Sequence, residues 1–278
     1  MTPEWPELPL DAWRDTRDTL HLWTQVAGKI RLKLAPPEPD WAHVTLYVTA
    51  TGLTTSPIPC SGNRVFQIDF DLVDHALHIV VSDGSRRVLP LVPKTVKAFH
   101  AEVMDAVRSL GIECEIWPKP QEIPGAIVFT EDEVHRSYDA AWANRFFEVL
   151  YRTDAVMKEY RGRFVGRTTP VHFFWGTFDL AVTRYLGDSM VACGFWPGDD
   201  RFAAPAFFAY TYPKPDGIET ATPWWNDDLG EFILPYEDVR TAPSPRDALL
   251  DFFERTYEAG AERVSPTGQA TPVPPSPQ

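Results

Sequence analysis

The chain has 278 residues, of which 44% are hydrophobic and 13% aromatic, and its formal net charge is −13. This length and apolar content suffice to bury a full core, either as one large domain or as two fused domains. The negative charge argues against binding to nucleic acid, which requires clustered Lys and Arg, and against an anionic membrane surface, but a small anionic substrate needs only one or two local cations.

The first ten residues are rich in proline and acid, unlike the basic and then apolar start of a secretory signal. No apolar run approaches the ~20 residues that span a bilayer. The three cysteines, Cys60, Cys114 and Cys193, lie far apart and outside any CxxC pair, which is typical of reduced thiols. These features predict a cytoplasmic protein that does not associate with a membrane.

An apolar stripe at helical spacing predicts a helix over residues 10–34. Pro36 and Pro37 end it, because proline cannot continue a helix. Apolar and polar residues then alternate over residues 43–50, which predicts a strand.

The next predicted element is a hairpin over residues 64–84, and its register follows from the pattern. With Val73 and Asp74 in the turn, one face becomes wholly apolar, which is what fixes a register. The same register places Asp69 opposite His78 on the other face. The apolar pairs are Phe70 with Leu77, Ile68 with Ile79, and Phe66 with Val81.

A short strand over residues 87–92 and an amphipathic helix over 95–110 complete this part of the chain. Gly111 ends the helix. Another strand is expected over 113–118, and the proline-rich residues 118–124 are typical of a linker.

The second half repeats this order. Its predicted elements are a helix over 139–164, strands over 170–185, 205–213 and 230–237, and a helix over 245–262. Residues 264–278 contain five prolines and little that could pack, which predicts a disordered tail.

Helix, strands and helix therefore occur twice, in residues 1–122 and 123–263. His43 opens the first strand of one half, and His172 opens that of the other. An internal duplication and a chance similarity between two halves would both give this order. We predict an α+β fold of mostly antiparallel sheets with helices on one face, in two structurally similar halves that can form one compact domain.

Standard catalytic signatures are missing from the sequence. It contains no GxGxxG, no P-loop, no HExxH, no paired CxxC and no GxSxG motif. We therefore predict neither a cofactor nor a recognisable zinc site.

Polar residues on the first sheet form one candidate site. Asp69, Asp71 and His78 share a face, where a carboxylate could orient an imidazole or the three groups could hold a divalent cation. An ordinary solvated sheet face with one cross-strand charge pair is the alternative.

A second candidate lies in the aromatic segment over residues 170–198. His172, Asp179 and Arg184 are set in a strongly apolar run, and unpaired buried charges are costly. Arg184 could anchor a carboxylate or phosphate, and Trp175 and Trp196 could stack on a ring. The alternative is a structural salt bridge between Asp179 and Arg184 in an aromatic core.

Two further features are weaker. Gln25 and Lys29, next to His21, form a polar stripe on the first helix that could face a pocket or could be only its wet edge. Trp224 and Trp225 could cap a pocket, or could equally cover the end of a sheet.

Several segments together resemble a bacterial protein family known only as a domain of unknown function: HLWTQVAGKIRL, LYVTATGLTTSPIP, FDLVDH, PVHFFWGTFDLAVTR and GFWPG. The resemblance covers nearly the whole chain and implies no established activity, cofactor or catalytic residue. It strengthens the candidates inside these segments. Relatives carry a longer segment, including a His-Glu pair, where this chain has only Tyr185 to Cys193, so a site that used it would be lost or changed here.

We therefore predict a small-molecule enzyme or ligand-processing protein with an aromatic pocket between its halves. In this hypothesis His172 is the acid or base, Asp179 orients it or pairs with Arg184, and Arg184 or Lys29 holds an anionic group. The alternative is a non-catalytic ligand-binding or protein-interaction module, and the oligomeric state stays open. The predicted walls are Trp175, Phe178, Trp196 and Tyr210.

Overall fold

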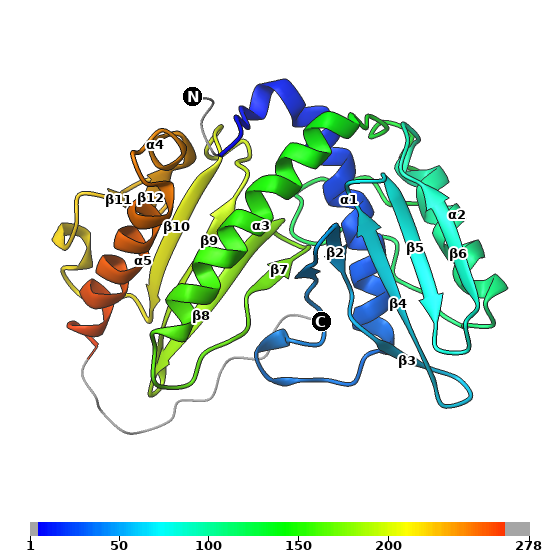
Figure 1. Cartoon of the computed structure of the whole chain (residues 1–278), viewed down its shortest axis with the longest axis horizontal. Coiled ribbons are helices and arrows are strands. Elements are labelled where there is room, and N and C mark those ends of the chain that lie inside the picture. Colours follow the sequence, from blue (N-terminus) through cyan, green and yellow to red (C-terminus); the bar gives the residue numbers. More distant parts are fainter. Residues whose placement is uncertain (1–4, 265–278) are drawn as a thin grey trace.

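The computed structural model describes residues 5–264 (Figure 1). These residues form five α-helices, and two short 3-10 helices occur in loops. The α-helices are α1 (Leu10–Leu34), α2 (Val96–Ser109), α3 (Ala140–Gly162), α4 (Tyr236–Arg240) and α5 (Pro245–Ala261). The 3-10 helices are η1 (Pro39–Trp41) and η2 (Ile218–Thr220).

Two antiparallel six-stranded sheets follow the order of the chain. The first has the order β1-β2-β4-β5-β6, with β3 paired to β4, and the second has the order β11-β12-β10-β9-β8-β7. Strands of the first sheet are β1 (Tyr47–Val48), β2 (Gly52–Thr54), β3 (Ile58–Cys60), β4 (Arg64–Asp71), β5 (Ala76–Val81) and β6 (Arg86–Pro90). Those of the second are β7 (His172–Phe174), β8 (Asp179–Leu186), β9 (Ser189–Trp196), β10 (Ala206–Tyr212), β11 (Trp225–Asn226) and β12 (Glu231–Pro235).

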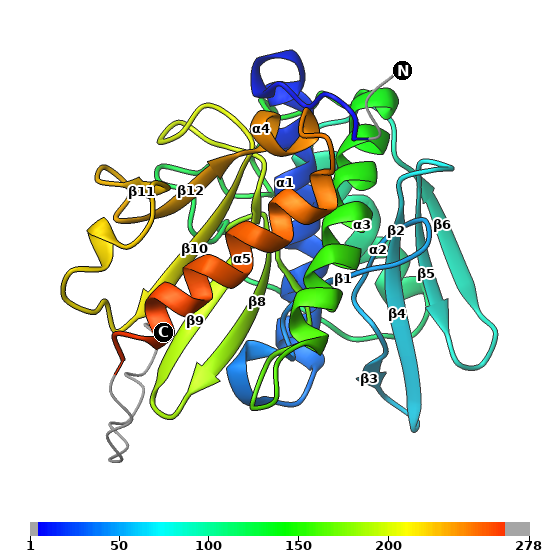
Figure 2. The ribbon, with the colours of Figure 1, turned by 60° about the vertical axis from the view of Figure 1, so that its left-hand side comes forward.

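The predicted α+β class and the two similar halves are confirmed. Each half runs from a long helix through an antiparallel sheet to a second helix. The helices gather between the two sheets, so that each sheet is covered on one face only (Figures 1 and 2). A bridge between Leu46 and Phe173, with both N···O distances 2.9 Å, joins the edges of the sheets.

One hydrophobic core extends through both halves. The ring of Trp13 in α1 lies 5.1 Å from that of Phe146 in α3, and Phe146 lies at the same distance from Phe178. Trp23, also in α1, stacks on Phe99 in α2 at 4.6 Å. Helix α1 therefore belongs to the packing of both halves.

The bounds predicted for α1, α2, α3 and α5 agree with the structure within two residues, and side-chain caps mark the start of α2 and α3. Thr95 accepts a hydrogen bond from the amide of Ala98, and Asp139 accepts one from the amide of Ala141. Such caps satisfy amide groups that have no partner inside the helix.

The predicted register of the β4–β5 hairpin is confirmed: Phe70 pairs with Leu77, Ile68 with Ile79, Phe66 with Val81, and Asp69 with His78. Two strand predictions were wrong. Residues 113–117 form no strand, and only Tyr47–Val48 of the expected 43–50 strand is regular. In both segments the alternation is present but no neighbouring strand pairs along its length.

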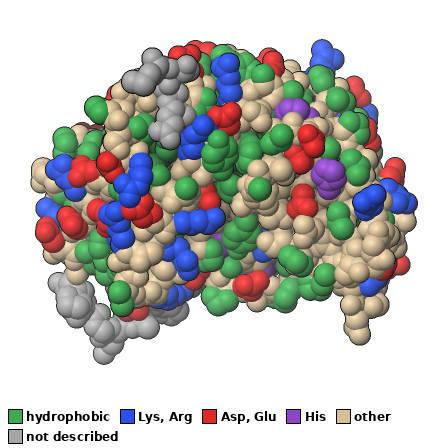
Figure 3. All heavy atoms as spheres, in the orientation of Figure 1, with side chains coloured by type: hydrophobic (Ala, Val, Ile, Leu, Met, Phe, Trp, Pro, Cys, Tyr) green, Lys and Arg blue, Asp and Glu red, His purple; other side chains and the backbone are tan. Residues whose placement is uncertain are grey.

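Among residues 5–264, no helix combines the length and apolar character needed to cross a membrane. On the face shown in Figure 3, side chains of Lys and Arg are interspersed with those of Asp and Glu. The tail predicted to be disordered lies outside the described residues, apart from Val264.

Candidate functional site

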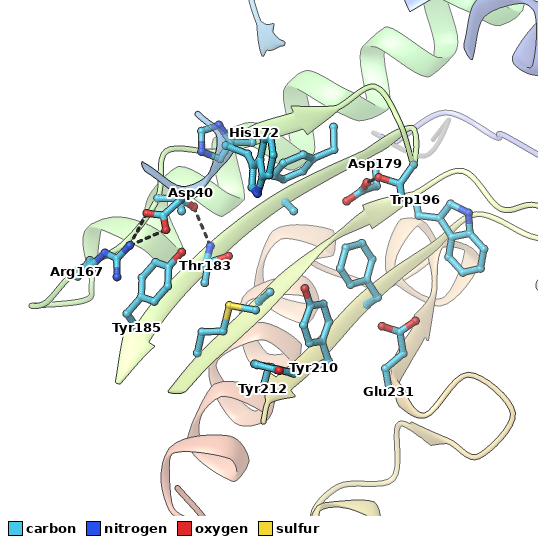
Figure 4. Close-up of a pocket in the computed structure, with 18 of the residues that line it drawn as sticks. Asp40, Arg167, His172, Asp179, Thr183, Tyr185, Trp196, Tyr210, Tyr212 and Glu231 are labelled. Atoms are coloured by element: carbon cyan, nitrogen blue, oxygen red, sulfur yellow. Dashed lines mark hydrogen bonds and ion pairs between the residues drawn. The ribbon is translucent and has the colours of Figure 1, made fainter. Parts of the chain in front are cut away.

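A cavity of about 820 Å³ lies on the uncovered face of the second sheet (Figure 4). Cavities of ~300–1,000 Å³ are typical of small-molecule sites. Strands β7 to β10 and β12 supply most of its lining, and Asp40 and Trp41 of η1 reach it from the first half. The cavity is therefore on an outer sheet face and not between the halves, where the pocket was predicted.

The strand alternation explains how this face is hollowed. Ala181, Ala192 and Gly194 present small side chains, or none, in the middle of the sheet, on strands β8 and β9. A Cβ atom at Gly194 would lie 2.5 Å from the Phe208 ring, so glycine is needed for this ring to lie across the strand. Larger rings surround the small residues: Trp41, Phe174, Tyr185, Trp196, Phe208, Tyr210 and Tyr212.

Two carboxyl groups lie at the same end of this cavity. Asp179, at the start of β8, accepts a hydrogen bond from Thr177, and Glu231 opens β12 (Figure 4). Burial raises the pKa of Asp179 to about 7, and the negative charges of Glu122 and Glu231 act in the same direction. Burial also raises the pKa of Glu231 to about 7. Both carboxyl groups can therefore gain or lose a proton near neutral pH.

The charges of both carboxyl groups affect the pKa of the Tyr210 hydroxyl. Burial raises the pKa of Tyr210 to about 12, and the charges of Asp179 and Glu231 contribute to this shift. Tyr210 therefore stays protonated at neutral pH and can donate a hydrogen bond within the cavity.

The two arginines of the lining already have carboxylate partners. Arg167 Nη2 lies 2.6 and 2.7 Å from the two oxygens of Asp40. Arg201 contacts Asp199 through Nε at 3.0 Å and Nη2 at 2.8 Å. These pairs neutralise the positive charge at the cavity.

His172 lines the cavity from β7, but without the predicted partner. Its Nδ1 lies 2.9 Å from Thr45 Oγ1, and its buried Nε2 has no hydrogen-bond partner within residues 5–264. Burial and, next, the positive charge of Arg31 lower the pKa of His172 to about 4. Asp179 does not orient this ring, because its carboxylate is bound by Thr177.

Arg184 and Trp175 lie on the helix-covered side. Arg184 follows Asp179 at an odd spacing, so its side chain points through the opposite face of β8, where it is 2% exposed and lies 2.8 Å from Glu254. The predicted salt bridge between Asp179 and Arg184 is therefore not formed. Trp175 Nε1 donates to the carbonyl of Val44 at 2.6 Å.

The polar stripe of α1 is also part of the interior. Gln25 fixes the 118–124 segment by accepting from the amide of Gln121 at 2.8 Å and donating to its carbonyl at 3.0 Å. Lys29 is 6% exposed, its Nζ lies 6.0 Å from the Trp175 ring centroid, and burial lowers its pKa to about 8. Of the seven predicted site residues, the structure brings together His172, Asp179 and Trp196.

Sequence reasoning missed Glu231, Asp40 and Trp41. Glu231 begins the strand in the apolar segment GEFILPYE. Because side chains alternate along a strand, Glu231 next to the buried Phe232 indicated a carboxyl group on the opposite face of the sheet. Asp40 and Trp41 precede His172 by at least 131 residues, and no sequence pattern near them indicated that they line the same cavity.

The first sheet does not assemble the cation site that we considered. Within residues 5–264, no three His, Cys, Asp or Glu side chains are grouped to hold a metal. Asp69 accepts a hydrogen bond from Gln67 at 2.7 Å, and Asp71 caps the hairpin by accepting from the amides of Val73 and Asp74.

The two adjacent tryptophans cover the end of the second sheet. Both are half-buried, and the ring of Trp224 lies 5.2 Å from that of Phe252 in α5. Trp225 Nε1 donates to Asp227 at 2.9 Å.

Comparison with known proteins gave one match. The model of a family of unknown function, DUF5996, matches residues 5–192 and 186–267. The two matched stretches overlap over residues 186–192, at the hairpin between β8 and β9. Neither the search of curated proteins nor that of solved structures found a match.

Proposed function

The chain belongs to DUF5996, a family of unknown function, and we propose that it binds a small organic molecule in the cavity on the uncovered face of its second sheet. The observation that carries this proposal is the cavity of about 820 Å³, whose aromatic walls surround a few polar groups. This combination is typical of ligand sites, since rings supply contact area and polar groups fix orientation.

The shape of the sheet supports the same proposal. The small residues Ala181, Ala192 and Gly194 leave a hollow in the middle of the sheet. Larger apolar side chains at these positions would fill the hollow and bury more apolar surface, so the hollow is not explained by packing alone. Trp224 and Trp225 pack against the protein, which favours ligand binding over the alternative of a protein-interaction surface built on them.

A second candidate function is acid–base catalysis on the bound molecule. It is favoured by the pKa of Asp179 and of Glu231, both near 7, where one carboxyl can donate a proton and another accept one. In this reading His172 is a polar contact, because its low pKa leaves it neutral at pH 7.

Native mass spectrometry of the freshly purified protein, compared with its denatured mass, tests the binding proposal, together with thermal-shift screening of small aromatic compounds. We expect a bound mass or a stabilising compound. Ala192→Trp should abolish either signal, because its side chain fills the hollow. Val80→Trp, on the uncovered face of the first sheet, is the matched control and should bind as the parent does.

Binding that survives Ala192→Trp in a folded protein would show that the ligand binds elsewhere.

The variants Asp179→Asn and Glu231→Gln distinguish acid–base catalysis from ligand binding alone. A catalytic site should lose turnover of the identified ligand by a factor of at least ~100 while still binding it, whereas a pure binding site has no turnover to lose.

A further inference from the structure

We infer that the molecule bound in this cavity carries a positively charged amine or ammonium group attached to an apolar body. This inference rests on the proposed function and specifies the class of its ligand. It follows from which charges face the cavity, and from what surrounds them.

The lining is rich in carboxylates. Four acidic side chains contribute to it, and only two guanidinium groups do. Arg167 is held by Asp40, and Arg201 by Asp199, so neither is available as a first partner for an anion. The acidic residues are Asp40, Asp179, Asp188 and Glu231.

In the part of the chain that the structure describes, Asp179 and Glu231 contact no positive group directly, although the charge of Arg201 acts on Glu231. Within residues 5–264, neither forms an ion pair with Lys, Arg or His. Two carboxyls at one end of a partly buried cavity repel each other when both are charged. Asp179 lies on β8 and Glu231 on β12, with β9 and β10 between them, and the charge of Glu231 acts on Asp179. A cation beside either carboxyl would offset this repulsion, whereas an anion would increase it.

The aromatic rings at this end fit the same ligand. Trp196 and Tyr210 lie on the same side of the cavity as the two carboxyls (Figure 4). The ring of Phe208 lies 6.4 Å from that of Tyr210. The face of an aromatic ring attracts a cation, and it also covers the apolar part of an organic amine. An aromatic wall combined with carboxylates therefore favours an organic cation over an organic acid.

Binding of a cation should be coupled to proton release. Burial raises the pKa of Asp179 and of Glu231 to about 7, and the charge of Glu122 adds to the shift of Asp179. The hydrogen bond from Thr177 to Asp179 and the charge of Arg201 near Glu231 act in the opposite direction. His172, on β7, is neutral at pH 7 because burial lowers its pKa to about 4. An ammonium ligand favours the ionised carboxylates, so its affinity should rise with pH.

Three probes with one skeleton test the inference: 4-phenylbutylamine, 4-phenylbutanol and 4-phenylbutyrate. Their affinities are measured by calorimetry on the whole protein near pH 6 and pH 8. At pH 8 we expect the amine to bind about tenfold more tightly than the alcohol, and the carboxylate most weakly. The affinity of the amine should rise about tenfold from pH 6 to pH 8, while that of the alcohol stays constant.

The double variant Asp179→Asn/Glu231→Gln should abolish the preference for the amine and its pH dependence, and should keep binding of the alcohol. Asp105→Asn/Glu133→Gln, which removes two exposed carboxylates in and beside α2, is the charge-matched control. Equal or tighter binding of the alcohol or the carboxylate by the parent protein overturns the inference and leaves the proposed function intact. If none of the three probes binds at millimolar concentration, both fail.

Discussion

The carboxyl group of Asp179 costs the folded protein stability at neutral pH. Its surroundings hold the protonated form, whereas an unfolded chain ionises it near its ordinary pKa of ~4. The native state therefore binds more protons than the unfolded state between about pH 4 and pH 7, so this group lowers stability as the pH rises through that window.

We predict that Asp179→Asn stabilises the protein at pH 8 by about 1–2 kcal/mol, a value reduced for solvent screening because the side chain is half-buried. The gain should shrink below pH 7 and vanish near pH 4, as measured by urea unfolding at several pH values. Asp188→Asn, whose carboxylate is exposed at the cavity mouth, is the control and should change stability little at any pH. A stabilisation that does not depend on pH would rule out this account.

For single residues, the alternation of side chains along a strand explains which candidate site residues the sequence could identify. His172, Asp179 and Trp196 were predicted together, and they line one cavity. Arg184 was grouped with them, although its odd spacing from Asp179 places it on the other face of β8. The sequence cannot say which face the helices cover, because that depends on contacts between distant elements.

At the scale of elements, Arg184 fixes α5 to β8. Its guanidinium group, 2.8 Å from Glu254, stacks on the Tyr160 ring at 3.4 Å and is almost completely buried. Removing only the carboxylate would leave a buried charge without a partner, which is more costly than removing the whole pair.

Glu254→Gln should therefore destabilise the protein by about 3 kcal/mol, and adding Arg184→Met should restore most of that loss. Arg163→Gln removes the more exposed neighbour of Glu254 and should cost less than about 1 kcal/mol. Urea unfolding of the single and double variants measures these values. A double variant no more stable than Glu254→Gln would contradict the prediction.

Elements bounded by caps, or by an apolar face, were predictable from the sequence. Helix α3 and the β4–β5 register are examples, since Asp139 caps the one and Phe70 with Leu77 fixes the other. Strand β9 was not predicted, because its buried residues Val191–Trp196 form a continuous apolar run that mixes small and large side chains and shows no alternation.

At the scale of the whole molecule, the shared core should make the two halves unfold together. Phe146 lies against Trp13, Phe173 and Phe178, so it contacts α1 and the second sheet at once. We predict that Phe146→Ala lowers stability by about 3–5 kcal/mol, and that tryptophan fluorescence and far-UV circular dichroism report one coincident transition.

Tyr151→Ala, on the same helix but partly exposed, should cost far less. Two separated transitions in the parent protein or in Phe146→Ala would show that the halves are independent folding units. The order of elements predicted the two halves, but their single core depends on helix α1 contacting both, which no local pattern encodes.

The hairpin between β8 and β9 offers a site for protein engineering. Leu186 pairs with Ser189, which leaves Gly187 and Asp188 as the two-residue turn, and both turn residues line the cavity mouth. Because the turn lies beyond the last strand pair, an inserted loop would reshape the entrance and leave the floor at Ala181 and Ala192 in register. A library of loops grafted there could yield a set of biosensors for different guests, all built on one unchanged scaffold.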